Sequence, residues 1–444
     1  MKGIIISGAK SGVGKTTITM AIMKALENVA PFKIGPDFID PKFHEYATKN
    51  KSYNLDAFLL GEELVKELFY EKSCGKNISL VEGVMGLYDG INHEIDNFST
   101  NHISKILNMP VILIVDGKGI STSIAAEVLG YKNLDKNSNI EGIIINNIGS
   151  EKSYLNLKEA IEKYCDVECL GYFPSLSEVS LESRHLGLVQ ADELENLDKT
   201  LEILENQAKE TIKLDRILEI ARKIEKPNTF NRDKSLKEIE NKLSGKRIGI
   251  AWDNAFTFYY NDNLELLEKS GIEIVKFSPM KDKTLPENID FLYFGGGYPE
   301  NYANELSKNQ SIIDDIKNFY KNSGKIYGEC GGFIYLTKGL LDLSNKFTDF
   351  VGLLDIKVQM KKSLNIKRFG YINIETNSNI LCKGHEFHYS DIYDIFEENT
   401  EFNISKLNGN SWKCGYKSKN LLAGYPHINF YTNIEFFKWI FDIN

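Results

Sequence analysis

Cysteine is scarce in this sequence, and none of it stands in a paired motif. No Cys-x-x-Cys pair occurs, and the six cysteines are Cys74, Cys165, Cys169, Cys330, Cys382 and Cys414. A chain of 444 residues does not need disulfides to hold its core together. We therefore expect free thiols in a reducing compartment, which is typical of a cytoplasmic protein.

The sequence also lacks long apolar runs and an excess of positive charge. No run of about 18 apolar residues occurs, so no transmembrane helix is expected. The apolar run near the N-terminus is too short for the core of a signal peptide. Lys and Arg number 53 against 62 Asp and Glu, which gives a net charge of −9. Because polyanions bind to basic surfaces, neither nucleic acid nor an anionic membrane is an expected partner.

Apolar runs that alternate with amphipathic stretches predict an α/β protein. Buried strands are expected at Ile4–Ser7, Ser79–Glu82, Val111–Asp116 and Gly142–Asn146, and later at Arg247–Ala251, Glu273–Phe277, Asp290–Phe294 and Lys325–Gly328. Helix spacing recurs from 194 to 224. The Asn- and Lys-rich segment 226–245 is typical of a linker. We predict one domain over 1–225, a linker over 226–245 and a second domain over 246–444.

A glycine-rich loop follows the first expected strand. Residues 8–17 read GAKSGVGKTT, and a helical stretch follows over Ile18–Leu26. Backbone N–H groups of such a loop can surround phosphates, and the helix dipole adds to the attraction. Ala9 stands where the standard pattern has its first glycine. We expect this loop to bind ATP with Mg²⁺ through Gly12, Gly14, Lys15, Thr16 and Thr17, with the Thr16 hydroxyl as a metal ligand.

Carboxylates follow two further expected strands. Asp37 and Asp40 lie in the turn-prone segment KIGPDFIDP, where they would hold Mg²⁺ or position a substrate, or only cap a turn. Glu82 ends a strand and Asp89 lies in the glycine-rich loop that follows it, VEGVMGLYDG. Ligands of open α/β sheets bind at the carboxyl ends of strands, so Glu82 is an expected second metal ligand and Asp89 a substrate contact. The alternative for both is an exposed loop acid.

A second chemical site is indicated by the segment GECGG, which places Cys330 between glycines at the end of a strand. Small neighbours permit the strained turn that exposes a nucleophile at the top of a sheet. The N–H of Gly331 can stabilise an oxyanion, and a helix N-terminus lowers the pKa of a thiol. The run GGGYPE after the neighbouring strand offers a second donor at Gly296.

A thiol nucleophile also needs a base, and the sequence offers several histidines. His427 lies in AGYPHINF, and His385 and His388 lie in GHEFHYS. The residues alone leave the choice between these two regions open. The roles of Lys10 beside the glycine-rich loop and of Arg184 in SRHLGL are open as well.

The motifs GAKSGVGKTT, KIGPDFIDP, VEGVMGLYDG, SRHLGL, GGGYPE, GECGG and GHEFHYS occur in this order over nearly the whole chain. Together they resemble the cobyrinic acid a,c-diamide synthase family. The resemblance implies an α/β protein of two domains, each a mostly parallel sheet flanked by helices. The first would be P-loop NTPase-like and similar to dethiobiotin synthetase, and the second a flavodoxin-like class I glutamine amidotransferase.

The resemblance also implies roles for residues. Cys330 would attack the γ-amide of glutamine with His427 as its base, and the ATP, Mg²⁺ and corrinoid site would comprise Asp37, Asp40, Glu82 and Asp89. Class I glutaminases follow the histidine with Pro-Glu, whereas this chain has Asn429 two residues after His427. The site therefore resembles a Cys–His dyad, and whether Asn429 orients His427 stays open.

The implied function is ATP- and glutamine-dependent amidation of the a and c side-chain carboxylates of cobyrinic acid through an acyl phosphate. The same chemistry on hydrogenobyrinic acid or nickel-sirohydrochlorin is an alternative, because no residue reports the metal of the tetrapyrrole. A partitioning-type ATPase with a degenerate amidotransferase tail is the alternative from another class. No pattern sets the oligomeric state, so a homodimer is an open option, as is the order of the two amidations.

Overall fold

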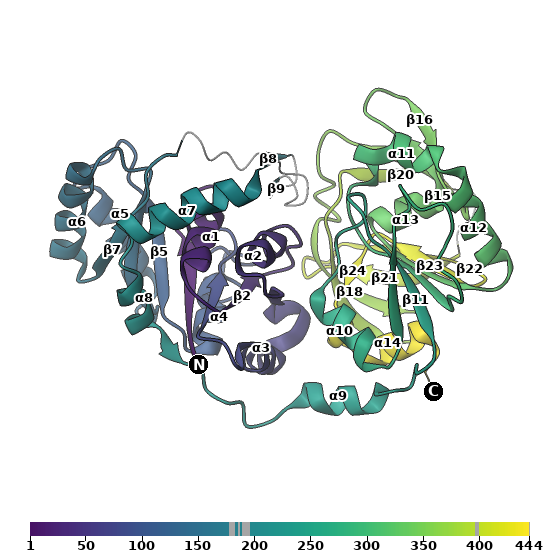
Figure 1. Cartoon of the computed structure of the whole chain (residues 1–444), viewed down its shortest axis with the longest axis horizontal. Coiled ribbons are helices and arrows are strands. Elements are labelled where there is room, and N and C mark those ends of the chain that lie inside the picture. The colour runs from purple at the N-terminus through teal and green to yellow at the C-terminus, as the bar shows by residue number, and fades with distance from the viewer. Residues whose placement is uncertain (177–182, 185–186, 189–195, 396–398, 444) are drawn as a thin grey trace. The chain divides into compact units, whose positions relative to one another are not determined.

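The chain forms two compact units, which are considered separately. The computed structural model describes residues 1–176, 183–184, 187–188, 196–395 and 399–443. The first unit is Met1–Asn231 and the second is Arg232–Asn444 (Figure 1). Both combine helices with a sheet that is mainly or partly parallel, which confirms the expected α/β class. Of the SRHLGL motif, His185 and Leu186 lie outside the described residues.

The first unit is built on an eight-stranded sheet in the order β3-β2-β4-β1-β5-β6-β7, with β10 paired to β1. The strands are β1 (Lys2–Gly8), β2 (Val29–Ile34), β3 (Tyr53–Leu55), β4 (Ile78–Glu82), β5 (Val111–Asp116), β6 (Ile140–Asn146), β7 (Glu168–Tyr172) and β10 (Arg222–Lys223). All pairs are parallel except β1–β10. Because the strands run in one direction, their carboxyl ends share one edge of the sheet.

Helices connect these strands and lie against the sheet (Figure 1). They are α1 (Lys15–Ala25), α2 (Asp40–Thr48), α3 (Ala57–Ser73), α4 (Thr100–Leu107), α5 (Ile124–Leu134), α6 (Glu151–Cys165), α7 (Leu197–Thr211) and α8 (Leu214–Ile220). Apolar residues of α1, α2, α7 and α8 form a core with those of the strands. A two-stranded ribbon, β8 (Ser183–Arg184) and β9 (Gly187–Leu188), lies between β7 and α7 in sequence. The helical stretch expected over 194–224 is two helices. It breaks where Ile212 bridges to Gly171 and Lys213 N donates to Leu170 O at 2.8 Å, which ties the chain to β7.

The segment predicted as a linker contains a helix, α9 (Asn231–Ile239). Beyond it, the second unit is built on a ten-stranded sheet in the order β12-β11-β13-β14-β23-β22-β21-β18-β19-β24. Its strands are β11 (Arg247–Ala251), β12 (Glu273–Phe277), β13 (Phe291–Phe294), β14 (Lys325–Glu329), β18 (Gly370–Thr376), β19 (Leu381–Glu386), β21 (Thr400–Ser405), β22 (Ser411–Ser418), β23 (Leu421–Gly424) and β24 (His427–Ile428). The part from β12 to β23 is parallel, and the part from β23 to β24 is antiparallel. No sequence pattern predicted this antiparallel extension, in which buried residues alternate with more exposed ones along strands such as β18.

The remaining elements of the second unit are a four-stranded sheet and flanking helices. The sheet has the order β16-β15-β17-β20, with β15 (Thr337–Leu341), β16 (Phe347–Asp349), β17 (Leu354–Met360) and β20 (Ser390–Ile395). The helices are α10 (Asn261–Lys269), η2 (Pro299–Tyr302), α11 (Ala303–Lys308), α12 (Gln310–Lys321), α13 (Gly331–Leu336), η3 (Phe430–Thr432) and α14 (Ile434–Phe441).

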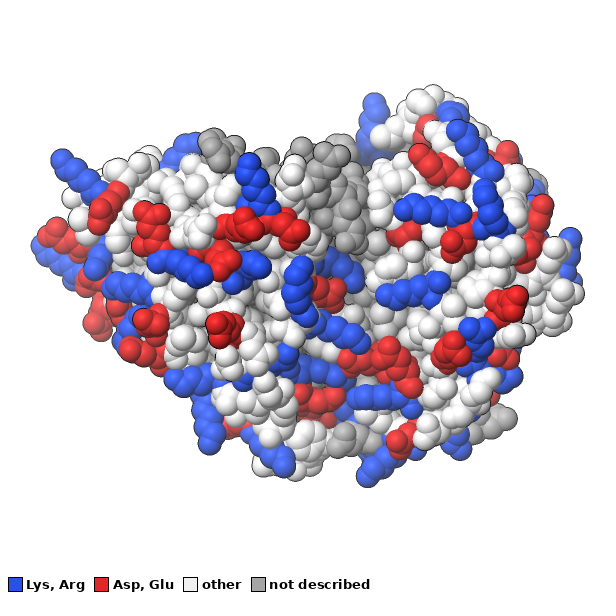
Figure 2. Space-filling model, viewed as in Figure 1, with Lys and Arg blue, Asp and Glu red and all other residues white. Residues whose placement is uncertain are grey.

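Charge of one sign is not concentrated on the surface in view. Figure 2 shows Lys and Arg interspersed with Asp and Glu, and neither sign forms a continuous field on that face. Among the described residues, no helix has both the length and the apolar composition to span a membrane.

Candidate active sites

The glycine-rich loop joins β1 to α1 in the first unit. Gly12 and Gly14 have φ angles of 75° and 91°, in the left-handed region that favours glycine. A Cβ on Gly14 would lie 2.1 Å from Nδ2 of Asn146, the last residue of β6, which also donates to Val13 O at 2.7 Å. Asn146 therefore packs against the loop and donates a hydrogen bond to it, a contact that no sequence motif indicated.

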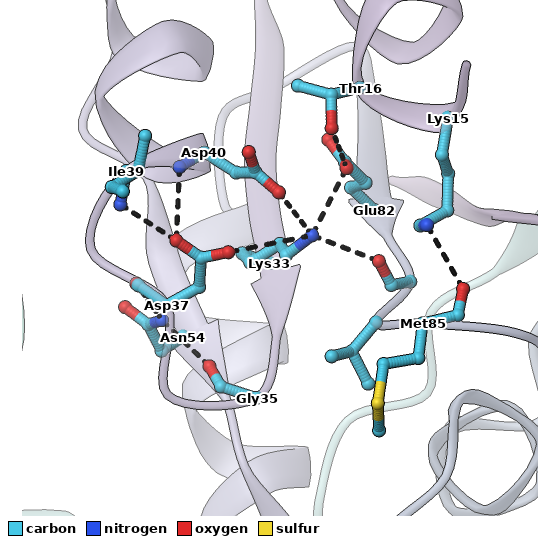
Figure 3. A network of polar contacts seen from close by, with 12 residues as sticks. Lys15, Thr16, Lys33, Gly35, Asp37, Ile39, Asp40, Asn54, Glu82 and Met85 are labelled. Carbon is cyan, nitrogen blue, oxygen red and sulfur yellow. Dashed lines mark hydrogen bonds and ion pairs between the residues drawn. The ribbon is translucent and has the colours of Figure 1, made fainter. Parts of the chain in front are cut away.

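Lys15 begins α1, and a backbone carbonyl binds its ammonium group. The side chain is buried, and Nζ donates to Met85 O at 3.0 Å (Figure 3). Burial, followed by the charge of Lys33, lowers the pKa of Lys15, against an opposing effect of Glu82. A phosphate group is well suited to this position, since it would supply the negative charge and the hydrogen bonds that the ammonium group requires.

A second lysine, Lys33 on β2, lies at the centre of the carboxylates (Figure 3). Its Nζ lies 2.5 Å from Asp40 Oδ2, 3.1 Å from Glu82 Oε1 and 4.0 Å from Asp37 Oδ2, and it donates to Gly83 O at 3.0 Å. Burial would lower the pKa of Lys33, but Asp40, Glu82 and Asp37 more than offset this and raise it. Lys33 therefore stays charged.

Glu82, at the end of β4, has partners on both carboxylate oxygens. Oε1 accepts from the Thr16 hydroxyl at 2.7 Å and from Lys33, and Oε2 lies 2.7 Å from Nε2 of His44. Burial would raise the pKa of Glu82, but Lys33 and the hydrogen bond with His44 lower it well below its usual value. This carboxylate is ionised, fixed in place and in contact with the glycine-rich loop.

Sequence reasoning missed Lys33 and His44. Lys33 lies inside the motif KIGPDFIDP, and it is the single charged residue in the apolar segment VAPFKI that forms β2. A lysine in such an apolar strand was the signal that the sequence offered. His44 is buried on α2, and its Nδ1 lies 3.2 Å from Ser52 Oγ. The register pairs Lys33 with Glu82 on adjacent strands, so the fold brings them together from 49 residues apart.

The other predicted carboxylates differ in their surroundings. Asp37 Oδ1 accepts from the backbone of Ile39 at 2.7 Å and of Asp40 at 3.2 Å, so it caps the start of α2 as well as facing Lys33. Burial, followed by the charge of Asp37, raises the pKa of Asp40 against the effect of Lys33. Asp89 Oδ2 accepts from Gly86 N at 2.8 Å, a contact within its own loop.

In the second unit, Cys330 occupies a sharp turn between β14 and α13. Its φ of 46° and ψ of −102° are strained for a residue with a side chain. Cys330 N donates to Gly424 O at 2.8 Å, and Gly332 N donates to Gly295 O at 2.9 Å, so neighbouring strands hold the turn on both sides. This is the strand–turn–helix geometry expected of a nucleophile elbow.

Two glycines allow the backbone to approach this turn closely. A Cβ on Gly331 would lie 2.9 Å from Gly297 N, and a Cβ on Gly296 would lie 2.3 Å from Cε1 of His427. The glycine run after β13 therefore packs directly against both the elbow and the histidine. Backbone N–H groups can converge on one point in this region.

The histidines that the sequence left as alternatives lie in one cluster. His385 and His427 are paired on β19 and β24, and their rings stack at 4.9 Å and 17°. His388 stacks on Tyr425 at 3.7 Å, and its Nε2 lies 3.2 Å from Glu386 Oε2. Burial, followed by His385 and His388, lowers the pKa of His427 well below its usual value, and burial lowers that of His385 to about 3.

The thiol and the nearby carboxyl groups are also shifted by burial. The lowered thiol pKa expected from the helix N-terminus is wrong for this site, because burial, then Glu300 and Glu386, raises the pKa of the Cys330 thiol. Burial raises the pKa of Glu300 to about 7 and that of Glu329, the residue before the thiol, to about 8. The resting thiol is therefore protonated at neutral pH, and a neutral His427 is available to receive its proton.

Comparison with known proteins identifies relatives of the whole chain. The family model described as the CobQ/CobB/MinD/ParA nucleotide binding domain matches residues 4–189, and the CobB/CobQ-like glutamine amidotransferase domain matches residues 247–434. A cobyrinate a,c-diamide synthase from Fusobacterium nucleatum subsp. nucleatum is 47% identical and covers 99% of this chain and 100% of its own. One from Caldanaerobacter subterraneus subsp. tengcongensis is 42% identical and covers 99% and 97%.

Solved structures resemble parts of the chain more distantly. A glutamine amidotransferase crystal structure covers 44% of this chain and 97% of its own, with 16% identity and a TM-score of 0.35. This similarity is too distant to bear on function.

Proposed function

This chain belongs to the cobyrinate a,c-diamide synthase family, and we propose on that premise that it is an ATP- and glutamine-dependent amidoligase. Its substrate would be cobyrinic acid, whose a and c acetate carboxylates become amides. The observation that carries the proposal is the presence of two sites in one chain. One is a phosphate loop beside a buried lysine and carboxylates, and the other is a strained thiol elbow beside a buried histidine.

The first unit would activate the substrate, because a carboxylate is a poor electrophile. The γ-phosphoryl group of ATP passes to a carboxylate oxygen, which yields an acyl phosphate and ADP. Ammonia then attacks the acyl carbon, and phosphate leaves. Lys15 and the loop from Gly12 through Gly14 to Thr16 and Thr17 would hold the phosphates, while electrostatic positioning supplies most of the rate.

Thr16 and Glu82 fit a magnesium ion bound with ATP. Within the described parts of the chain, no three His, Cys, Asp or Glu side chains form a ready-made metal site. Mg²⁺ in nucleotide sites takes one or two carboxylates together with phosphate oxygens and waters, so a ready-made cage is not needed. The Thr16 hydroxyl and the ionised Glu82 are adjacent hard oxygen ligands beside the phosphate loop. The ion would neutralise phosphate charge there.

The substrate carboxylate and its phosphorylated form would be positioned by Lys33, Asp37, Asp40 and Asp89. The ammonium group of Lys33 can balance charge that develops on phosphoryl oxygens, and Asp40 holds that group in place. Asp37 supports Asp40 through its cap on α2, and Asp89 shapes the loop whose Met85 carbonyl binds Lys15.

The second unit would release ammonia from glutamine. Sγ of Cys330 attacks the γ-carbonyl carbon, the amides of Gly296 and Gly331 stabilise the oxyanion, and His427 carries the proton from the thiol to the departing ammonia. Water then hydrolyses the thioester to glutamate. The six cysteines are free, which fits a reducing cytoplasm as the site of action.

The proposal is tested by incubating the purified protein with ATP, Mg²⁺, glutamine and cobyrinic acid, and following mono- and diamide by chromatography. Hydrogenobyrinic acid and nickel-sirohydrochlorin serve as parallel substrates. We expect glutamine-dependent diamide from cobyrinic acid. ATP hydrolysis without glutamine consumption would instead identify a partitioning-type ATPase, and preference for another tetrapyrrole would correct the substrate.

A further inference from the structure

Glu329 is a buried acid immediately before the nucleophile. It is the last residue of β14, lies opposite Gly424 of β23 and is 2% exposed. A carboxyl group removed from water costs free energy unless it is hydrogen-bonded or paired with a charge. Its position at the active end of the parallel strands suggests that the cost serves a function.

The surroundings of this carboxyl group are polar and directed. Oε1 accepts from the Tyr327 hydroxyl at 2.9 Å and from Ile428 N at 3.3 Å, and Oε2 accepts from the Tyr293 hydroxyl at 3.1 Å. Oε2 also lies 3.9 Å from Nδ1 of His427. Glu329 thus binds the backbone beside His427 and faces the imidazole ring itself.

We propose that Glu329 is the positioning acid of His427, replacing the glutamate that class I glutaminases place two residues after the histidine. This inference rests on the proposed glutaminase activity of the second unit. Asn429 occupies that later position, but its Oδ1 accepts from Tyr431 N at 3.0 Å and caps η3. The acid is therefore supplied by the strand that carries the nucleophile.

The role follows from the tautomer that the base requires. To take a proton from Sγ of Cys330, His427 must keep Nε2 free and carry its own proton on Nδ1. In its ionised form, Glu329 beside Nδ1 favours this tautomer and stabilises the imidazolium ion once the thiol proton has moved. The positive ring in turn lowers the pKa of Glu329 from its resting value of about 8. A shift of about 1 Å closes the 3.9 Å separation to an ordinary hydrogen bond.

The same proton accounts for the complete step. The S–C bond forms as Sγ attacks the amide carbon, and the C–N bond breaks as the proton on Nε2 passes to the departing nitrogen, which leaves as ammonia. Glu329 acts in its ionised form and carries no proton in this step. Other titratable groups around the pair are His385 and His388 beside His427, and Tyr259, Tyr293 and Tyr327 beside Glu329.

The test compares Glu329→Gln with a matched control in the same unit. Glu401→Gln also changes a buried glutamate. Glu401 lies on β21 and pairs with Lys417 on β22. We expect Glu329→Gln to lower glutaminase kcat by about 10- to 100-fold, the scale of loss when a carboxylate that orients a metal-bound histidine is removed, with little change in KM for glutamine. Glu401→Gln should keep the glutaminase kcat of the wild type. Glu329→Gln should keep the wild-type rate of synthesis with free ammonia.

A second readout separates positioning from structural support. Alkylation of Cys330 by iodoacetamide, followed by mass spectrometry of its peptide across pH, reports formation of the thiolate–imidazolium pair. In Glu329→Gln this profile should move to higher pH. The measurement needs no glutamine, so it tests the role of Glu329 independently of glutaminase activity. If the wild type releases no ammonia from glutamine, the proposed function is rejected, and the alkylation profile still tests Glu329.

Two further variants complete the test. If Glu329→Gln does not fold, Tyr327→Phe removes one donor to the carboxylate, and the midpoint of glutaminase activity should move to higher pH. An unchanged midpoint there, or wild-type kcat and alkylation in Glu329→Gln, overturns the inference. Asn429→Ser keeps an oxygen for the cap, and a large loss of kcat in this variant alone would assign the orienting role to Asn429.

Discussion

Two buried glutamates illustrate how partners set the state of a residue. Both Glu82 and Glu329 end parallel strands and are almost fully enclosed. Burial acts on both in the same direction, but Glu82 has Lys33 and His44 against its oxygens and its pKa falls. Glu329 has hydroxyl and amide donors without a lysine or arginine, and its pKa rises to about 8. Glu82 is suited to hold a cation, whereas Glu329 is suited to ionise when a positive imidazolium ion forms beside it.

Replacement of Lys33 should abolish synthesis without affecting ammonia release. Lys33→Met leaves Asp40 and Glu82 without their shared ammonium group, so phosphoryl transfer should fall by at least about 100-fold with glutamine or free ammonia. Lys42→Met is the control, because Lys42 pairs with Glu45 on the same helix, outside the cluster. Diamide formation and glutaminase are measured for both. Near-normal synthesis by Lys33→Met would show that Lys33 is structural.

His427 and His388 are distinguished by a pair of variants. His427→Ala should lower glutaminase turnover by about 100-fold or more, the usual scale for loss of a general base. His388→Ala should have a much smaller effect, because His388 bonds Ser390 O and Glu386 rather than the elbow. Steady-state ammonia release decides between them. The reverse order of effects would make His388 the base.

Glu329 should also make the stability of the second unit depend on pH. Its folded pKa of about 8 lies above the unfolded value of 4.5, so its contribution is complete below pH 4.5 and is lost as pH rises to 8. The loss is at most about 1.4 kcal/mol per pH unit. The Tm of Glu329→Gln should therefore rise relative to that of the wild type as the pH increases from 5 to 8. A constant difference in Tm across that range would argue against the raised pKa.

At the scale of elements, each site depends on loops that follow parallel strands. The phosphate loop after β1 lies beside the ends of β4 and β6, and the glycine run after β13 lies beside the elbow after β14. Loops after adjacent parallel strands meet because the strands end at one edge of the sheet. The chain therefore assembles each site from segments that are distant in sequence.

Replacement of Gly296 tests the packing of the glycine run. Gly296→Ala would place a Cβ 2.3 Å from Cε1 of His427 and should displace the ring or the loop. We expect glutaminase to fall at least about 10-fold, since small misplacements at a reacting centre are costly. Gly352→Ala is a control for backbone change, because its φ is 72° and no atom lies within 4 Å of the new Cβ. Equal activity of the two variants would contradict the close approach.

At the scale of the whole molecule, the two units should be separable by chemistry. Cys330→Ser should lose synthesis with glutamine but keep synthesis with free ammonia, because the thiol serves only to release ammonia. Lys15→Ala should lose synthesis with both nitrogen sources and keep basal glutaminase. The assays are diamide formation and glutamate release. If Cys330→Ser remains folded and loses both activities, the division of labour between the units is wrong.

The sequence by itself determined the fold class, the phosphate loop and the thiol elbow. Each is encoded in local spacing, since GAKSGVGKTT follows the apolar run of β1, and Cys330 with its two following glycines comes directly after the end of β14. Residues at the ends of expected strands and in a turn also indicated Asp37, Asp40 and Glu82, which the structure gathers around one lysine.

Only the tertiary structure decided which side chains complete each site. Strand register places Lys33 beside Glu82, and helix α2 brings His44 to the same carboxylate. In the second unit, the pairing of β19 with β24 sets His385 against His427, and β14 brings Glu329 to the same ring from 98 residues away. Such contacts depend on how strands are ordered and aligned in a sheet, and local residue patterns do not specify that order.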